Sequence, residues 1–366
     1  MCGQRFSFLR RPFATRSHER VIIAQSGFEK KIVWKTALPE SSKVALVKWH
    51  VNDELAQVLA NELTQLGYRP QFFQHDAEIP PDAAIVLTFA PYGELLPILR
   101  RAASRLSPPL VAHWNFEGSP DLGLPWQAVY TLSALRSRLD GIPLLNRKWK
   151  RYRYLGDYFY AYRRGWLDVL AVISQQHETI YQAHGLPAQY VPWGTSPQFY
   201  RTLNLERDID VLWFGKRRDS HRSTLIEQVR AEMQARGFNM LLADGVEHPF
   251  IYGNKRTEIL NRSKIVLNVK TLAQNSGFTF RFHMVAGNRA LIVAEDFLSH
   301  VPNYQAGVHY ASAPSERLAQ TIVYYLEHES ERAALAENAF QLATTEMTLY
   351  NSVRKLMQCV EASRAA

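Results

Sequence analysis

Short apolar runs alternate with longer amphipathic segments along most of this 366-residue chain. The run at 43–49 (KVALVKW) predicts a buried strand, and the segment from Asn52-Asp53 to about Leu66 predicts a helix that ends at Gly67. Continuous apolar runs bounded by turn residues are typical of parallel strands that helices cover on both faces. The first half of the chain is therefore predicted to form βαβ units.

Four more strands and two more helices complete the predicted first half. The strands lie at 69–74, within 80–91, within 108–118 and at 168–175, and the helices lie at 92–106 and 176–185. In open α/β sheets, ligands bind beyond the carboxyl ends of the strands. His113 and Glu117, at the exit of the 108–118 strand, are therefore candidates for a general base or for orienting an acceptor hydroxyl. The alternative is that their neighbouring aromatic residues pack and the polar groups satisfy loop backbone.

A second alternation follows the segment 188–208, in which Pro192, Gly194 and Pro197 fall within six residues and predict a linker. Beyond it we expect strands at 209–214, 238–245, 264–270, 290–294 and 307–311, with helices after Gly215, at 253–263, at 280–288 and, as a pair, within 315–345. The predicted organisation is a basic leader at 1–40, a first α/β domain at 41–190, a linker at 191–208, a second α/β domain at 209–345 and a C-terminal helix at 346–366. Disorder is one interpretation of the leader.

The composition is that of an ordinary globular protein, with 46% hydrophobic and 21% charged residues. No apolar run approaches the roughly 18 residues of a membrane span. The two cysteines, Cys2 and Cys359, form no spacing motif, so a reducing cytoplasm is the default expectation. The Arg-rich start lacks the apolar core of a secretory signal, and a transit peptide is a weaker alternative.

The formal charge of +9 is concentrated in two segments. Residues 1–35 hold eight basic and two acidic residues, and residues 146–164 hold seven basic residues and one acidic residue among several tyrosines. The second segment has three interpretations: a solvated helix face, a site for anionic lipid or glycan, or a nucleic-acid site. No RRM, KH or zinc-finger signature supports the last, so we expect no nucleic-acid partner. Peripheral membrane contact through 147–164 stays a hypothesis.

Two stretches in the second half combine glycine with basic residues. Gly215, Lys216, Arg217 and Arg218 follow a strand and precede a helix, an arrangement that favours a diphosphate, although a basic surface loop has the same sequence. Lys270 ends another strand that should open at the same edge, unless it is simply solvated. In SGFTFRFHMVAGNRALIVAED (276–296), Arg281 stands between two phenylalanines, and a charge so placed usually needs an anionic partner.

Four passages resemble group 1 glycosyltransferases of the GT-B fold, especially a CgeB-like subgroup: YVPWGTSPQFY, IDVLWFGKRRDSHRSTLI, RTEILNRSKIVLNVK and GFTFRFHMVAGNRALIVAED. The resemblance spans about 168–345 and implies an α/β protein with two Rossmann-like domains facing across a cleft. By position it implies that Gly215, Lys216 and Arg218 face the donor diphosphate. It also implies that Gly277 and Phe278 lie beside the donor phosphates and sugar.

By the same correspondence, Arg281 matches an arginine of the subgroup and would pair with donor phosphate or with an acid inside the site. The chain departs from the family where two glutamates eight positions apart are usual, because those columns read Ser276 and Met284. His283, Glu295 or Asp296 could substitute; otherwise the donor chemistry differs or activity is lost. Arg289 stands where glycine is common, and we expect it to face solvent.

The resemblance implies a metal-independent hexosyltransferase with no cofactor, whose substrate is a UDP- or GDP-sugar. The acceptor would be a hydroxyl of a glycan, of a lipid-linked molecule or of a protein, as in cell-envelope glycan biosynthesis. The expected location is cytoplasmic, or peripheral on the inner face of the membrane. Because no DxD metal motif appears, Lys216, Arg218, Lys270 and Arg281 would stabilise the leaving diphosphate. The alternative function is a GT-B-shaped binding or assembly subunit without catalysis.

Overall fold

The computed structural model describes residues 42–50, 53–89, 95–116, 128, 131, 153–217, 220–270, 280–296 and 303–365. The basic leader and residues 147–152 lie outside the described residues, as do four of the predicted site residues and their neighbour: Glu117, Arg218, Ser276, Gly277 and Phe278.

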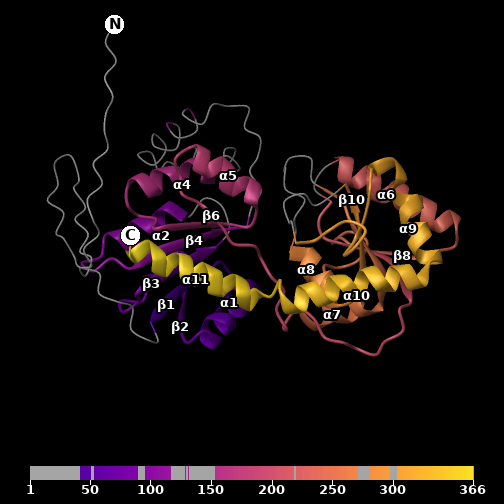
Figure 1. The fold of residues 1–366 in the computed structure, drawn as a ribbon, viewed down its shortest axis with the longest axis horizontal. Coiled ribbons are helices and arrows are strands. Elements are labelled where there is room, and N and C mark those ends of the chain that lie inside the picture. Colours follow the sequence, from indigo (N-terminus) through magenta and orange to yellow (C-terminus); the bar gives the residue numbers. More distant parts are fainter. Residues whose placement is uncertain are drawn as a thin grey trace, which may run out of the picture.

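The first lobe is built on a six-stranded parallel sheet in the order β2-β1-β3-β4-β5-β6 (Figure 1). Its strands are β1 (Lys43–Lys48), β2 (Arg69–Gln74), β3 (Ile85–Phe89), β4 (Leu110–Asn115), β5 (Val169–Val172) and β6 (Gln189–Tyr190). Every residue of β3, β4 and β5 is buried, as continuous apolar runs require when helices cover both faces of a sheet.

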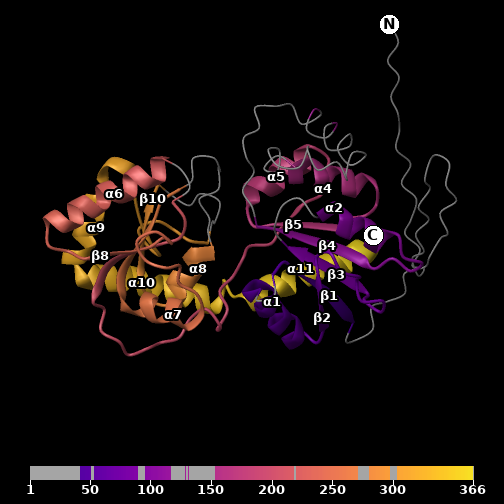
Figure 2. The same ribbon diagram turned by 180° about the vertical axis from the view of Figure 1, so that it is seen from behind.

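Five described helices belong to this lobe: α1 (Glu54–Gln65), α2 (Leu95–Ala103), α4 (Arg153–Arg163), α5 (Gln175–Ala183) and, from the far end of the chain, α11 (Leu349–Ala365). Asp53 starts α1 as its N-cap, because its Oδ1 accepts the Ala56 amide hydrogen bond at 3.1 Å. Helices α4 and α5 lie on one face of the sheet, and α1 and α11 lie on the other (Figures 1 and 2).

The second lobe is built on a five-stranded parallel sheet in the order β11-β10-β9-β7-β8. Its strands are β7 (Ile209–Phe214), β8 (Met240–Ala243), β9 (Ser263–Asn268), β10 (Leu291–Glu295) and β11 (Ala311–Ala313). The helices are α6 (Ser220–Ala235), α7 (Gly253–Arg262), α8 (Phe280–Gly287), α9 (Leu318–Glu327) and α10 (Glu329–Thr345), with a 3-10 turn at Ser315–Arg317 before α9. The expectation of an α/β protein with two parallel sheets is confirmed.

The chain crosses between the lobes twice, and the two crossings are hydrogen-bonded to each other. The Thr195 amide donates to the Met347 carbonyl at 2.8 Å, and the Leu349 amide donates to the Thr195 carbonyl at 2.7 Å. Gly194 allows this approach, since a Cβ there would lie 2.3 Å from the Thr348 carbonyl carbon. The linker and the α10–α11 connection therefore form one paired junction.

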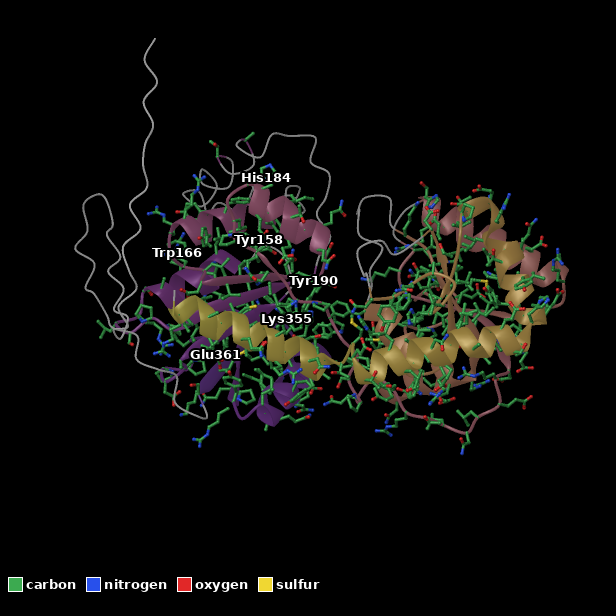
Figure 3. All side chains as sticks on the ribbon, in the orientation of Figure 1. Tyr158, Trp166, His184, Tyr190, Lys355 and Glu361 are labelled. Atoms are coloured by element: carbon green, nitrogen blue, oxygen red, sulfur yellow. The ribbon has the colours of Figure 1, made fainter. Side chains whose placement is uncertain are left out.

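Helix α11 returns the end of the chain to the first lobe, where it is drawn in yellow across the purple sheet (Figure 1). The Tyr68 hydroxyl donates to Glu361 of this helix at 2.6 Å, and Lys355 Nζ lies 5.1 Å from the centroid of the Tyr190 ring (Figure 3). The C-terminal helix is thus part of the first lobe in space.

Three elements differ from the sequence-based expectation. The last strand of the second sheet lies at Ala311–Ala313 rather than at 307–311, because Gly307 has a positive φ of 77° and belongs to the preceding turn. The short strand β6 lies at the start of the predicted linker. Helix α4 covers a segment for which a helix face was only one of three interpretations. Among the helices that the structure describes, none is long and apolar enough to cross a bilayer.

Candidate functional site at the edge of the second sheet

Three central strands of the second sheet end together at one edge. Leu212 of β7 pairs with Val266 of β9, and Ala294 of β10 pairs with Asn268 of β9. Because parallel strands end on the same side, the residues that follow them are brought together. Asn268 is 4% exposed, and its Oδ1 is buried with no hydrogen-bond partner in the described part of the chain. An acceptor of this kind is available to a ligand.

Glycine is required at position 215, directly after β7, both by the backbone conformation there and by the lack of space for a side chain. Its φ of 121° lies in the region that side chains rarely adopt. A Cβ at this position would lie 2.5 Å from Nη2 of Arg281. The sequence-predicted glycine loop and the lone arginine are therefore in contact, although 65 residues separate them in the sequence.

Arg281 points its guanidinium back at the sheet edge from the first turn of α8. Its Cζ lies 4.4 Å from the centroid of Trp213 and 5.0 Å from that of Phe214. The residue as a whole is partly exposed, but its Nε and Nη1 atoms are buried and have no hydrogen-bond partner among the residues that the structure describes. Burial, and secondarily the charge of Arg222, lower the pKa of Arg281 to about 9. A cation held this way without a carboxylate lacks its counter-charge.

Arg222 supplies a second cation, one that the sequence analysis did not single out. It is 7% exposed, donates to the Lys216 carbonyl at 3.3 Å and to the Val269 carbonyl at 3.0 Å, and lies 5.5 Å from the Trp213 centroid. Trp213 is thus a shared platform for both guanidinium groups. A sequence signal existed, because Arg222 occupies the buried stripe of α6 that continues through Leu225 and Ile226.

Lys216 and Arg217, the described basic residues of the glycine loop, differ from Arg281 and Arg222 in their surroundings. Lys216 is exposed. Arg217 forms ion pairs with Asp244, at 2.6 Å, and with Glu227. Only the backbone of Lys216 is tied into the site, through its carbonyl bond to Arg222.

Lys270 is held by the two acids that end β10. Its amide donates to Oε2 of Glu295 at 3.2 Å, and its ammonium forms an ion pair with Asp296, which raises the pKa of Lys270 against the opposing effect of burial. Glu295 has a fully buried side chain that also binds His221 Nε2 at 2.7 Å and accepts from the Ser315 hydroxyl at 2.7 Å. Lys270 is therefore neutralised by neighbouring acids, in contrast to Arg281.

Met284, which stands in one of the two glutamate columns, and its neighbour His283 are part of the interior. Met284 is 8% exposed and packs in the core. His283 is fully buried, with Nδ1 at 3.1 Å from the Tyr304 hydroxyl, and burial lowers its pKa to about 3. His283 is therefore a neutral core residue.

Arg289 has a backbone conformation that favours glycine, the residue common at this position in the family that the sequence resembles. Its φ is 55°, which is the left-handed conformation that ends a helix. The side chain is partly exposed, bonded to Glu337 at 2.6 Å and to Thr202 at 3.0 Å, and lies over the Phe340 ring. These contacts hold Arg289 just beyond the C-terminal end of α8, whereas Arg281 lies in its first turn.

His113 lies at the end of β4 in the first lobe, fully enclosed. It is 2% exposed, with Nδ1 at 2.9 Å from the Thr88 hydroxyl and Nε2 at 3.1 Å from the Tyr158 hydroxyl. Burial lowers its pKa to about 3. Both ring nitrogens are therefore engaged inside the protein, and the imidazole is neutral.

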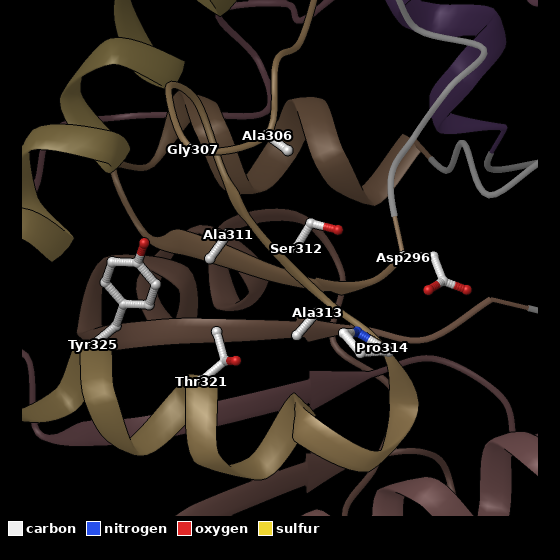
Figure 4. Close-up of a pocket in the computed structure, with 9 residues that line it drawn as sticks. All are labelled: Asp296, Ala306, Gly307, Ala311, Ser312, Ala313, Pro314, Thr321 and Tyr325. Atoms are coloured by element: carbon white, nitrogen blue, oxygen red, sulfur yellow. The ribbon is translucent and has the colours of Figure 1, made fainter.

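A hollow of about 360 Å³ opens beside the acids of β10, between β11 and α9 (Figure 4). Asp296 lines it together with the hydroxyl-bearing residues Ser312, Thr321 and Tyr325. In the described part of the chain, no three His, Cys, Asp or Glu residues are grouped to hold a metal ion.

Comparison with known proteins places this site in context. A family model described as glycosyl transferase-like matches residues 217–358, which begin inside the glycine loop and include Arg222, Lys270 and Arg281. No curated protein sequence matches the chain.

Solved structures resemble the whole fold at low sequence identity. A glycosyltransferase from Rickettsia africae is 13% identical, covers 88% of this chain and 98% of its own, and has a TM-score of 0.57. Anabaena Alr3699/HepE in complex with UDP and glucose is 10% identical, and the match covers 88% of this chain and 100% of the HepE chain with a TM-score of 0.55. The sucrose-phosphate synthase tll1590 from Thermosynechococcus elongatus is 9% identical, with 87% and 98% covered and a TM-score of 0.54. The chain therefore has the GT-B arrangement of two Rossmann-like lobes, and its residues 217–358 match a family model described as glycosyl transferase-like.

Proposed function

We propose that this protein is a glycosyltransferase that moves a sugar from a nucleoside diphosphate donor to a hydroxyl group of an acceptor. One observation carries the proposal: Arg281 lies against Gly215 just after β7, with two buried guanidinium nitrogens that no group in the described part of the chain binds. A diphosphate supplies the anionic acceptors that these donors lack. Membership of the CgeB-like subgroup, suggested by Arg281 and by the passage ending in Asn268, is part of the same proposal.

The cation pair would act on the leaving group. In the transfer, the bond between the anomeric carbon and the diphosphate oxygen breaks, a bond from the acceptor oxygen forms, and the acceptor loses its proton to a base. Negative charge grows on the departing diphosphate, and Arg281 and Arg222, which both lie against the Trp213 ring, would stabilise that charge. Lys216, Arg218, Gly277 and Phe278 complete the donor side of the proposal.

The first lobe would receive the acceptor, a hydroxyl of a glycan, of a lipid-linked molecule or of a protein. Glu117 and His113 are the proposed acceptor-side groups. His113 can accept a proton only if it gives up its bond to Thr88 or to Tyr158. Glu117 is the first residue to test as the base.

Charge stabilisation by arginine side chains also motivates the proposal that the reaction needs no divalent metal. Transfer measured with excess EDTA and with added Mg²⁺ checks this. Equal rates support it, and a requirement for Mg²⁺ contradicts it.

UDP is the first nucleotide to test, because HepE was solved with UDP and glucose and with UDP-glucose. We expect calorimetry to show binding of UDP or GDP to the wild-type chain and none to Arg281→Gln. Arg236→Gln is the matched control, since Arg236 directly follows the last residue of α6 and forms an exposed ion pair with Glu232. Unchanged nucleotide affinity in Arg281→Gln, or loss of affinity in Arg236→Gln as well, would refute the site.

The second candidate function is a binding or assembly subunit that holds a nucleotide without transfer. Met284 favours it, because this buried thioether occupies a column where the related enzymes carry a glutamate. Incubation with UDP-glucose or GDP-mannose, followed by detection of released nucleotide, separates the two. Nucleotide binding with no release on any acceptor fraction selects the subunit.

A further inference from the structure

The helix that carries Arg281 is fixed by contacts with both lobes. Figures 1 and 2 both show α8 on the side of the second lobe that faces the first. The hydroxyl of Thr195, in the linker, donates to the His283 carbonyl of α8 at 3.2 Å. At the other end of the helix, a Cβ on Gly287 would lie 2.9 Å from Tyr200. The position of α8 therefore depends on chain segments outside its own sheet.

The first residue of α8 belongs to an aromatic cluster that joins the lobes. Phe280 meets Phe116, directly after β4 of the first lobe, with ring centroids 5.1 Å apart and planes at 88°. It also meets Trp193 of the linker at 4.8 Å and 90°. Phe116 and Trp193 contact each other at 4.8 Å and 73°. These are the edge-to-face geometries that aromatic pairs prefer, so each ring constrains the others in direction as well as distance.

The two phenylalanines that flank Arg281 anchor in opposite directions. Phe282 packs into the second lobe, with centroids 4.3 Å from Tyr304 and 5.4 Å from Tyr310. Phe280, two residues earlier, packs toward the first lobe. The arginine between them faces Trp213, and its alignment with Gly215 depends on both anchors.

We infer that Phe280 is a positioning residue for the anion site, and that Phe116 of the first lobe contributes to donor binding through it. The inference rests on the proposed function. It adds that the affinity of the second lobe for a nucleoside diphosphate depends on an apolar contact from the first lobe. Phe116 itself contacts four aromatic rings, those of Phe89, Trp114, Trp193 and Phe280.

The test measures UDP and GDP affinity by calorimetry in the full chain for Phe116→Leu, Phe280→Leu and the double variant. Loss of one directional ring contact should weaken binding about two- to tenfold in each single variant. The double variant should be no weaker than the weaker single variant, because both substitutions break the same link. Phe280→Tyr keeps the ring and should keep the affinity. If Phe116→Leu does not fold, Phe116→Met provides the same comparison.

Glu54→Gln is the matched control, because Glu54 of α1 forms a separate side-chain link between the lobes. It accepts two hydrogen bonds from Arg256 of α7, at 2.7 and 3.1 Å, and neither bond involves α8. We expect this variant to keep wild-type nucleotide affinity. Wild-type affinity in Phe116→Leu, or equal losses in Glu54→Gln and Phe116→Leu, overturns the inference while leaving the proposed function intact. If the wild-type chain binds neither nucleotide, the proposed function fails and the inference fails with it.

Discussion

Replacing Arg281 by methionine should stabilise the protein while removing its nucleotide binding. In the free protein the Arg281 guanidinium is a buried cation whose Nε and Nη1 are unbonded. The fall of its pKa from 12.5 to about 9 corresponds to a cost on the order of 4 kcal/mol. Partial exposure of the residue reduces that to about 2–3 kcal/mol through solvent screening.

The cation–π contacts with Trp213 and Phe214 offset about 1 kcal/mol of this cost. Methionine keeps the apolar packing and has no charge. We therefore expect Arg281→Met to raise the free energy of unfolding by about 1–2 kcal/mol, the sign seen when buried charges are replaced by apolar residues.

The sign of the pH dependence follows from the same shift. Above pH 9 the folded state binds fewer protons at Arg281 than the unfolded state, so wild-type stability at this group rises with pH. The advantage of Arg281→Met should therefore be full at pH 7 and smaller at pH 10. Urea unfolding at both pH values, without nucleotide, measures this, with calorimetry for UDP alongside. A variant less stable than wild type at pH 7 would refute the reasoning, because it would show that the guanidinium has a stabilising partner within the protein.

The remaining predictions concern backbone contacts and buried histidines. Gly215→Ala should cost about 2–3 kcal/mol of stability and weaken UDP binding. Gly237→Ala, at a φ of 77° with open space around it, should cost only about 1 kcal/mol and leave UDP binding unchanged. Equal effects of the two substitutions in unfolding and calorimetry would contradict this. Gly194→Ala should cost more than 2 kcal/mol, on the order of a severe core change, because its Cβ would lie 2.3 Å from the Thr348 carbonyl carbon; a melting temperature within 2 °C of wild type, measured by circular dichroism, would be against it. Because burial lowers the pKa of His113 and His283 to about 3, each should remove up to about 2 kcal/mol of stability as the pH falls from 6.5 to 5, and His113→Gln should flatten that slope in urea titrations.

The sequence predicts the sheets well because their strands are continuous apolar runs of the right length. The boundaries of β2 and β7 match the predicted ones, since turn residues bound both runs. Strand β11 begins later than the sequence predicts. The three-residue segment ASA carries almost no periodic signal, so the predicted strand starts in the glycine turn that precedes it.

The candidate site was harder to predict than the fold. Gly215 and Arg281 could be proposed from the sequence, but their direct contact depends on the pairing of lobes and strands. Arg222 was missed because single basic residues near a helix start are usually solvated. Lys270 cannot be distinguished from Arg281 by sequence alone. Only the fold shows that Asp296 neutralises Lys270, whereas no described residue neutralises Arg281.

The placement of α11 has a consequence for biosynthesis. The first lobe is encoded in two pieces separated by the whole second lobe, because α11 (Leu349–Ala365) follows that lobe in the chain. During translation the early sheet therefore waits, with the part of its face beside Tyr68 uncovered, until α11 has left the ribosome. A nascent chain that stops before residue 349 holds a finished second lobe beside an unfinished first one, so premature termination should yield an aggregation-prone product rather than a smaller working protein.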